Sequence, residues 1–395
     1  MTKLKRIQEL FFLLGVFFLP IYQTINHWFL GGFLFISTLL LIFVKETREY
    51  TLKHKNLILF VAVFFVIRLV GLFTAINFSY GLKETLRALP FLLYPMAIVS
   101  LNNRVELKSL ERKVFYVLAA GCLTTSIICW GHLLFINSGD GSAAYKIFGW
   151  KKSGAYLTEA LDLHPPYLGM LMVASIFFLL KELFYNHSLK TKRPIIGLVS
   201  FILFVFLFNI TARNAFLYLI LVSAIFLIYR KKWKLVLISV GLLLILGAVI
   251  VKHPSQYYRL KFYHMLNVSG NEEIKDRRFE RLTASYNVFK SNPLLGVGPG
   301  FDDKLRVLEY EKNNDKIAAQ NKYNSHNQLF EYLVNFGFLG GLIFIVINMV
   351  FLFLLIHKKN IFYAVLLTGF IFASLTESIF ERVLGIQYYS IVVSM

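Results

Sequence analysis

The chain has 395 residues, of which 57% are hydrophobic and only 16% are charged. Soluble globular domains carry roughly 25% charged residues, so this composition excludes an ordinary soluble protein and indicates a membrane protein. The net charge of +20 does not by itself indicate a nucleic-acid partner, because most basic residues lie in short clusters between apolar runs.

The apolar runs predict membrane-spanning helices. Each run approaches the roughly 20 residues that a helix needs to cross a hydrocarbon core of about 30 Å. Helices are required there because an unpaired backbone group in lipid costs several kcal/mol. We therefore expect an all-α polytopic membrane protein with about 12 transmembrane helices, at residues 7–25, 27–44, 56–76, 82–101, 114–136, 164–183, 194–211, 214–229, 235–251, 329–356, 361–375 and 379–393.

The basic clusters predict the orientation of these helices. Clusters such as Arg230 to Lys234 precede the first run or follow an even-numbered one. The positive-inside rule then places these turns and both ends of the chain in the cytoplasm. A long polar interval between the ninth and tenth runs faces the periplasm under this scheme.

Three parts follow from this topology: residues 1–251 with helices one to nine, residues 252–328 as one large periplasmic loop holding a candidate active site, and residues 329–395 with helices ten to twelve. The loop is rich in aromatic residues, which is unlike a disordered segment. Residues 278–290 show apolar spacings of three and four, so this stretch is predicted to be helical and to stop at Pro293.

Arginines are the first candidates for chemistry. Arg213 joins two apolar runs at the outer membrane face, where it either snorkels to the interface or contacts an anion. Arg277, Arg278 and Arg281 lie close together in the loop. They predict an anion site, or else a solvated helix whose charge nearby acids compensate.

The loop also contains a glycine-rich stretch and a histidine. Gly296 and Gly298 indicate either a tight turn or a close approach of the backbone to another group, and without a following Lys-Ser/Thr they do not form a P-loop. His326 can accept a proton near neutral pH, which suits a general base, although a capping or interface role is the alternative.

Polar residues elsewhere on the predicted outer side complete the candidate set. Asn327 is placed to support His326 or to cap the tenth helix. His164 and Glu377 fall on the same side, where structural roles compete with catalytic ones. We expect no metal site, since the external histidines lack close ligand spacing and no external cysteine assists them.

Together these motifs resemble the bacterial O-antigen ligase and O-antigen polymerase superfamily. The resemblance covers roughly the second half of the chain. One departure is Leu282, where members often have Trp. The matching features are Arg278 placed before Asn292-Pro293-Leu294-Leu295-Gly296-Val297-Gly298-Pro299-Gly300, then His326-Asn327-Gln328, Thr211-Ala212-Arg213, His164-Pro165-Pro166-Tyr167 and Leu375-Thr376-Glu377-Ser378.

The resemblance implies glycosyl transfer on the periplasmic side of the bacterial inner membrane. The donor would be an undecaprenyl-pyrophosphate-linked glycan and the acceptor either lipid A-core or a second lipid-linked glycan, with no cofactor and no required metal. Arg213 and Arg278 would bind the pyrophosphate, with Arg277 and Arg281 as neighbouring candidates, and His326 would take the acceptor proton. Membrane lipid, and no nucleic acid, is the further partner.

Three alternatives stay open from the sequence. The ligase and polymerase types differ in their acceptor, which the residues do not separate. A transporter or flippase of a lipid-linked saccharide or small anion would use the same membrane arginines, although transporters typically show paired broken helices in two related halves. A non-catalytic scaffold for polysaccharide assembly would not need His326 or the arginines.

Overall fold

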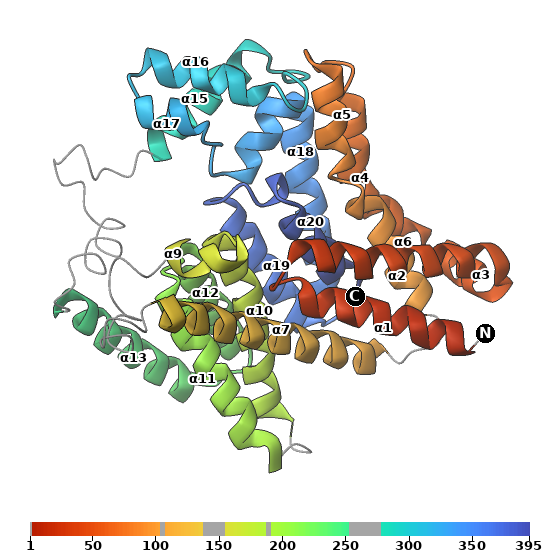
Figure 1. Ribbon diagram of the computed structural model, residues 1–395, viewed down its shortest axis with the longest axis vertical. Coiled ribbons are helices and arrows are strands. Elements are labelled where there is room, and N and C mark those ends of the chain that lie inside the picture. Colours follow the sequence, from red (N-terminus) through yellow and green to blue (C-terminus); the bar gives the residue numbers. More distant parts are fainter. Residues whose placement is uncertain (1, 103–106, 137–154, 187–190, 253–277) are drawn as a thin grey trace. The chain divides into compact units, whose positions relative to one another are not determined.

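The computed structural model describes residues 2–102, 107–136, 155–186, 191–252 and 278–395 (Figure 1). Within these ranges all regular secondary structure is helical. The chain divides into two compact units. Unit 1 comprises Met1–Glu9, Gly31–Leu110 and Asp276–Met395, and unit 2 comprises Leu10–Leu30 and Glu111–Lys275.

The predicted apolar runs correspond to helices. The fourth run consists of α5 (Phe78–Leu86) and α6 (Pro90–Asn102), and the last run of the 3₁₀ turn η6 (Ile379–Glu381) and α20 (Val383–Ser394). The other runs form α1 (Thr2–Phe18), α2 (Gln23–Phe43), α4 (Lys55–Gly71), α7 (Leu107–Ile136), α10 (Pro165–Tyr185), α11 (Arg193–Asn209), α12 (Arg213–Tyr229), α13 (Trp233–Lys252), α18 (Gln328–His357) and α19 (Ile361–Ser374).

The long apolar helices are those of a membrane protein. Among the described residues, five are long and apolar enough to cross a bilayer, or six if α4 and the preceding α3 (Lys45–Lys53), which meet at a 72° bend, form one span. Helices such as α11, α12, α19 and α20 are apolar but shorter. The all-helical class is therefore confirmed, whereas the number of twelve spans and the three-part domain division stay predictions.

The described part of the polar interval, from residue 278 onward, contributes three helices to unit 1: α15 (Arg278–Ser291), α16 (Asp302–Lys312) and α17 (Lys316–Asn321). They pack in succession, and α15 also packs on α18 (Figure 1). Ala284, Tyr310 and Ala318 form a small buried core among them. The described part of the interval is thus folded and helical, and α15 ends just before Pro293, as the sequence predicted.

An aromatic cluster forms the centre of unit 1. Rings from α4, α6, η6 and α20 meet edge to face, with Phe91 and Phe380 4.8 Å and Phe64 and Phe380 5.3 Å apart between ring centres. Tyr389 lies 5.1 Å from Phe380. Such contacts add about 0.5–1.5 kcal/mol each to apolar burial, and they fix η6 beside the first turns of α18.

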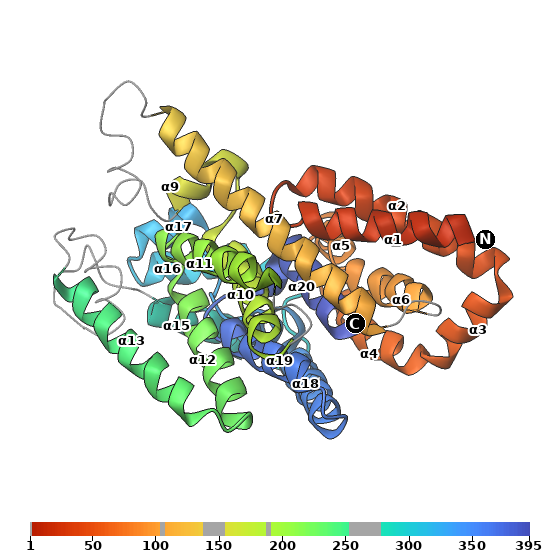
Figure 2. The same ribbon diagram turned by 90° about the horizontal axis from the view of Figure 1, so that it is seen from below.

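In unit 2, α10 packs against both α11 and α12 (Figures 1 and 2). Gly169 permits the close approach of α10 and α12, since a Cβ atom there would meet the side chains of Ala212 and Ala215. The N-terminal ends of α10 and α12 therefore lie together. Short elements α9 (Ala155–Thr158) and η3 (Glu159–Leu161) precede α10.

A break in α18 is paired with the glycine-rich stretch. Gly337 has φ 64° and ψ −161° inside this helix, a conformation available essentially to glycine alone. The carbonyls of Val334 and Asn335 accept hydrogen bonds from the amides of Val297 and Gly298, both at 2.9 Å. The glycine-rich stretch thus completes the backbone hydrogen bonding of a helix that follows it in the sequence.

Both interpretations of the glycines hold in the structure. Gly296 and Gly298 both have positive φ, 69° and 76°, so each makes a tight turn. A Cβ atom at Gly296 would meet the backbone of Asn335, and one at Gly298 would meet the backbone of Ala75. Both features that glycine permits, the turn and the close approach, occur here, and both serve packing inside unit 1.

Candidate active site

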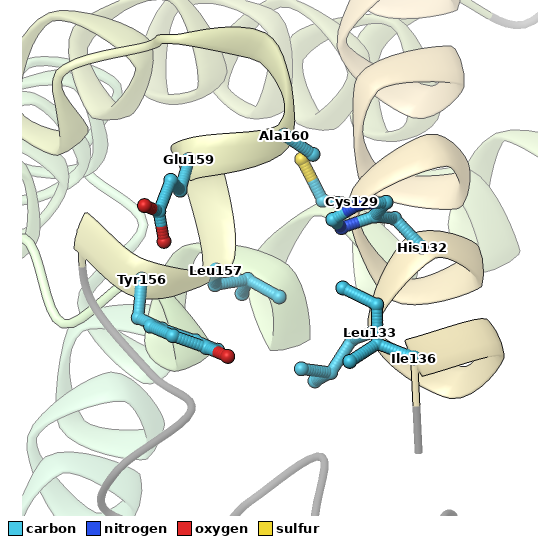
Figure 3. A pocket seen from close by; sticks show the side chains of 8 residues that line it. All are labelled: Cys129, His132, Leu133, Ile136, Tyr156, Leu157, Glu159 and Ala160. Atoms are coloured by element: carbon cyan, nitrogen blue, oxygen red, sulfur yellow. The ribbon is translucent and has the colours of Figure 1, made fainter. Parts of the chain in front are cut away.

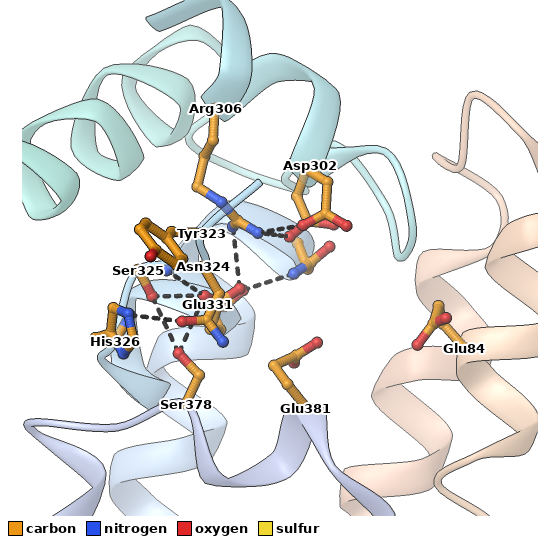
Figure 4. Close-up of polar contacts among 12 residues, drawn as sticks. Glu84, Asp302, Arg306, Tyr323, Asn324, Ser325, His326, Glu331, Ser378 and Glu381 are labelled. Carbon is orange, nitrogen blue, oxygen red and sulfur yellow. Dashed lines mark hydrogen bonds and ion pairs between the residues drawn. The ribbon is translucent and has the colours of Figure 1, made fainter. Parts of the chain in front are cut away.

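His326, labelled in Figure 4, lies in unit 1 immediately before α18. Its ring lies close to the carboxylate of Glu377. Nδ1 of the imidazole is 3.4 Å from Oε1 of Glu377, and the two side chains are 18% and 7% exposed. This spacing is slightly beyond a regular hydrogen bond, and Nδ1 has no hydrogen-bond partner among the described residues. The pair is therefore a close, mostly buried contact of a titratable base with a carboxylate.

The backbone of His326 is constrained as well as its ring. Its φ is +50°, in the left-handed region that few non-glycine residues adopt, although histidine does so more often than most of them. The side chain of Asn324 accepts a hydrogen bond from the His326 amide at 3.1 Å. The turn thereby directs the imidazole toward the residues that follow α19.

Asn327 is the N-cap of α18. Its side-chain oxygen accepts hydrogen bonds from the amides of Leu329 and Phe330 at 2.9 and 3.2 Å, which satisfies two of the donors that a helix start leaves free. Its side-chain nitrogen, Nδ2, donates a hydrogen bond to the carbonyl of Leu375 at 3.0 Å. The residue therefore caps a helix and also ties the His326 turn to the end of α19, close to Glu377.

Two of the predicted arginines reach this region from α15. The guanidinium of Arg278 donates to the carbonyl of Thr376, beside Glu377, at 3.3 Å. The guanidinium carbon of Arg281 lies 4.3 Å from the centre of the Tyr323 ring. Arg278 and Arg281 are thus brought to the two segments that carry Glu377 and His326, whereas Arg277 lies outside the described residues.

The segment carrying Glu377 is anchored on its far side by α4 and α18. Arg68, only 3% exposed, donates to the carbonyl of Phe380 at 3.0 Å and lies 3.6 Å from Glu381. The amide of Phe380 donates to the side chain of Gln328 at 2.5 Å. A buried arginine and a buried glutamine thereby hold η6, and with it Glu377, in a fixed place.

A buried charge network beneath His326 escaped the sequence analysis. Glu331 in α18 and Arg306 in α16, each 1% exposed, form an ion pair at 3.0 Å (Figure 4). Arg306 also pairs with Asp302 at 2.6 Å and Asp303 at 2.7 Å. An acidic residue inside an otherwise apolar run is a recognised signal of function in membrane helices, and Glu331 carries that signal.

The two remaining candidates, Arg213 and His164, lie in unit 2. Arg213 opens α12 directly after a turn in which Thr211 has φ +48°. His164 precedes α10, and its exposed ring packs edge to face on Tyr167 at 5.6 Å. Because the N-terminal ends of α10 and α12 lie together, these two residues occupy the same end of this helix pair.

Unit 2 also contains an open cavity of about 390 Å³ between the end of α7 and the α9–η3 turn (Figure 3). Tyr156, His132 and Glu159 supply polar groups to a lining that is otherwise mainly apolar. None of the residues predicted for the active site lines it. We assign no role to this cavity.

The residues around His326 have side chains that can accept a proton and bind an anion. A carboxylate facing Nδ1 favours the tautomer that carries its proton there, which leaves the other ring nitrogen, Nε2, as the acceptor. Arginine guanidinium groups offer paired donors that match phosphate oxygens. The arrangement therefore brings a histidine, which can act as a base, and two guanidinium groups, which can bind an anion, to the segments near the start of α18.

Part of the chain matches a known protein family. Residues 198–345 match the family model described as O-antigen ligase. The match confirms the resemblance to the O-antigen ligase and polymerase superfamily, and it spans Arg213, Arg278, the glycine-rich stretch and His326. A comparison with curated proteins finds no match. The matched domain indicates a glycosyltransferase type of activity in a bacterial membrane, in which lipid-linked glycans are the general class of substrate.

Proposed function

We propose that the protein transfers or polymerises an undecaprenyl-pyrophosphate-linked glycan on the periplasmic side of the bacterial cytoplasmic membrane. The observation that carries this proposal is the contact of His326 with Glu377 beside Arg278. His326 and Arg278 lie inside the segment that matches the O-antigen ligase family, and Glu377 follows that segment in the chain. The activity is of the O-antigen ligase or polymerase type.

The reaction forms one bond and breaks one. The acceptor hydroxyl oxygen bonds to the anomeric carbon of the donor sugar, while the bond from that carbon to the pyrophosphate oxygen breaks. His326 takes the hydroxyl proton on Nε2 as general base, a role worth roughly 10²- to 10⁴-fold in rate. Glu377 stabilises the imidazolium that results.

The leaving group is a lipid pyrophosphate whose negative charge grows as the bond breaks. In the proposal Arg278 and Arg281 on α15 bind it, because cations aimed at developing charge are a major source of rate enhancement. Arg213 in unit 2 is proposed to bind the same group, on the strength of the family resemblance and of its guanidinium chemistry. In this scheme the arginines take the part that a divalent metal plays in many other transferases.

The alternative function, transport of a lipid-linked saccharide or small anion, receives less support. Broken membrane helices in transporters leave backbone carbonyls free to coordinate an ion. In α18 the carbonyls of Val334 and Asn335 are instead paired with backbone amides of the glycine-rich stretch. The break therefore serves packing between two segments of unit 1.

The proposal is tested by transfer from a purified undecaprenyl-pyrophosphate-linked glycan, in detergent with chelator present. The native chain is compared with His326→Asn, which keeps a residue that tolerates the left-handed backbone, and with Arg278→Ala. His357→Ala is the matched control, because His357 is an exposed histidine at the other end of the same helix. Both lipid A-core and a second lipid-linked glycan are offered as acceptors.

We expect transfer with chelator present, a loss of about 10²-fold or more in His326→Asn, and native activity in His357→Ala. The acceptor that is consumed separates a ligase from a polymerase. Transfer that survives in His326→Asn at the native rate contradicts the proposed base. Absence of transfer with either acceptor, combined with saccharide movement across vesicles that His326→Asn leaves unchanged, favours the transporter.

A further inference from the structure

One oxygen of Glu331 binds the residues next to both members of the His326–Glu377 pair. Oε1 accepts a hydrogen bond from the amide of Ser325 at 2.8 Å and from its hydroxyl at 2.6 Å. The same oxygen accepts from the hydroxyl of Ser378 at 3.1 Å (Figure 4). Ser325 directly precedes His326, and Ser378 directly follows Glu377.

These contacts are enclosed. Ser325 and Ser378 are fully buried, and Glu331 is 1% exposed. The hydroxyl of Ser325 also lies 2.9 Å from the carbonyl of Asn327. Since a serine has one hydroxyl proton, the shorter, charge-assisted bond to Glu331 is the stronger of the two.

The carboxylate is itself held in place from the other side. Its second oxygen, Oε2, accepts from Arg306 at 3.0 Å. Arg306 pairs in addition with Asp302 and Asp303, so its guanidinium is fixed by three carboxylates. Because both of its oxygens are hydrogen-bonded, the Glu331 carboxylate has little freedom to rotate. The two serines are therefore bound to a carboxylate that is held in one orientation.

We propose that Glu331 is a positioning residue: by binding Ser325 and Ser378 through one oxygen, it fixes the separation between the His326 imidazole and the Glu377 carboxylate. The inference rests on the proposed function, in which that separation matters. Glu331 does not touch the reacting atoms in this scheme and acts only through the two serines. Residues that orient a catalytic group typically contribute 10- to 100-fold when they are removed, by analogy with the outer-shell partners of metal ligands.

The experiment compares Ser378→Ala with Ser374→Ala. Ser374 is an equally buried serine, four residues earlier, whose hydroxyl bonds to the carbonyl of Phe370 in its own helix at 2.9 Å. Both variants lose a buried hydroxyl, but only Ser378→Ala loses a bond to Glu331. Transfer rates per folded molecule are measured across pH, with kcat and donor KM determined separately.

We expect kcat of Ser378→Ala to fall by about 10-fold or more, with donor KM close to native because the α15 arginines are untouched. The acid side of its pH–rate profile should move, since the interaction of an imidazole with a carboxylate depends on their separation. Ser374→Ala should match the native chain in both respects.

A double variant makes the test independent of folding losses. If Ser378 acts through His326, then adding Ser378→Ala to His326→Asn should leave the residual rate unchanged, whereas two independent structural effects would multiply. The conservative Glu331→Gln, which keeps an acceptor oxygen but removes the charge facing Arg306, should lower both stability and kcat.

Two results overturn the inference while leaving the proposed function intact. In one, Ser378→Ala and Ser374→Ala have equal kcat and equal pH profiles although His326→Asn is inactive. In the other, the effects of Ser378→Ala and His326→Asn multiply. A native chain that transfers no glycan, or a fully active His326→Asn, rejects the proposed function itself, and the positioning role falls with it.

Discussion

The guanidinium of Arg281 stacks over the ring of Tyr323, with 4.3 Å between the guanidinium carbon and the ring centre. That ring is 6.1 Å from the imidazole of His326. One aromatic side chain thus links the cation of α15 to the proposed base. The stack fixes the direction in which Arg281 presents its donors.

Arg281→Lys should therefore weaken donor binding even though the charge is kept. A lysine loses the planar stack, which is worth about 0.5–1 kcal/mol at partly exposed sites, so donor KM should rise about two- to fivefold. Tyr323→Phe should be near native and Tyr323→Leu should behave like Arg281→Lys. Lys290→Ala is the control, because Lys290 is an exposed cation at the end of the same helix. An equal rise in donor KM in this control would contradict a specific role for the stack, because loss of positive charge anywhere on α15 would then weaken donor binding.

Gly337→Ala should destabilise unit 1. The backbone at this position has φ 64° and ψ −161°, and a Cβ atom there would meet the carbonyl group of Leu294. Strain of this kind costs about 1–3 kcal/mol, which thermal unfolding in detergent would detect. Gly31→Ala is the control, because a Cβ atom there has no neighbour within 4 Å, and an equally stable Gly337→Ala would show that α18 runs straight.

The acid branch of the stability curve should depend on Asp303. Partial burial of a side chain that is still 42% exposed, together with the neighbouring charge of Asp302, raises the pKa of Asp303 to about 6, although Arg306 partly opposes the shift. A carboxylate whose pKa is raised in the folded chain binds its proton more tightly there than in the unfolded chain. Its contribution to stability therefore declines as pH rises from about 4 to 6.

Asp303→Asn should remove that pH dependence. The unfolding midpoint of the variant at pH 7 should equal or exceed the native value, and the difference between the two chains should shrink toward pH 4.5. Arg306 keeps Asp302 and Glu331 as partners in this variant. A variant that is less stable than the native chain at pH 7 would mean that the ion pair outweighs the burial of the Asp303 charge.

The predicted sidedness can be measured with single cysteines. The native thiols of Cys122 and Cys129 are 0% and 1% exposed, so they should remain silent toward a membrane-impermeant maleimide. Lys316→Cys in α17 and Lys358→Cys after α18 replace exposed side chains. We expect Lys316→Cys to be labelled from the periplasm and Lys358→Cys to be labelled only after the membrane is permeabilised. The reverse labelling pattern would show that the topology is opposite to the predicted one.

Hydropathy located the helices but not their interruptions. The run 329–356 contains several glycines, and nothing in an apolar sequence marks Gly337 as the one that leaves the helical conformation. Its φ is set by contacts with Leu294 and Pro293, which belong to another segment. Similarly, the first run ends at Phe18, ahead of Pro20, and the fourth divides before Pro90.

Sequence patterns selected candidate site residues, but they did not predict the contacts between them. His326, Arg278 and Glu377 could be selected from residue type and motif, but the contact of His326 with Glu377 joins distant parts of the chain and depends on how α18 meets the end of α19. Glu331 had a visible signal, a carboxylate in an apolar run. Its partner Arg306 had none, because an arginine in a charged helix looks solvated until packing buries it to 1% exposure.

In the pairing between the glycine-rich stretch and α18, the hydrogen-bond donors are synthesised before the acceptors. Val297 and Gly298 leave the ribosome before Val334 and Asn335, whose carbonyls they will bind. An interrupted helix that enters lipid with unpaired carbonyls carries several kcal/mol of unfavourable free energy for each one. In this chain the complementary amides of Val297 and Gly298 are already made when α18 emerges, so docking of the preceding segment can pair these carbonyls as soon as the helix is synthesised.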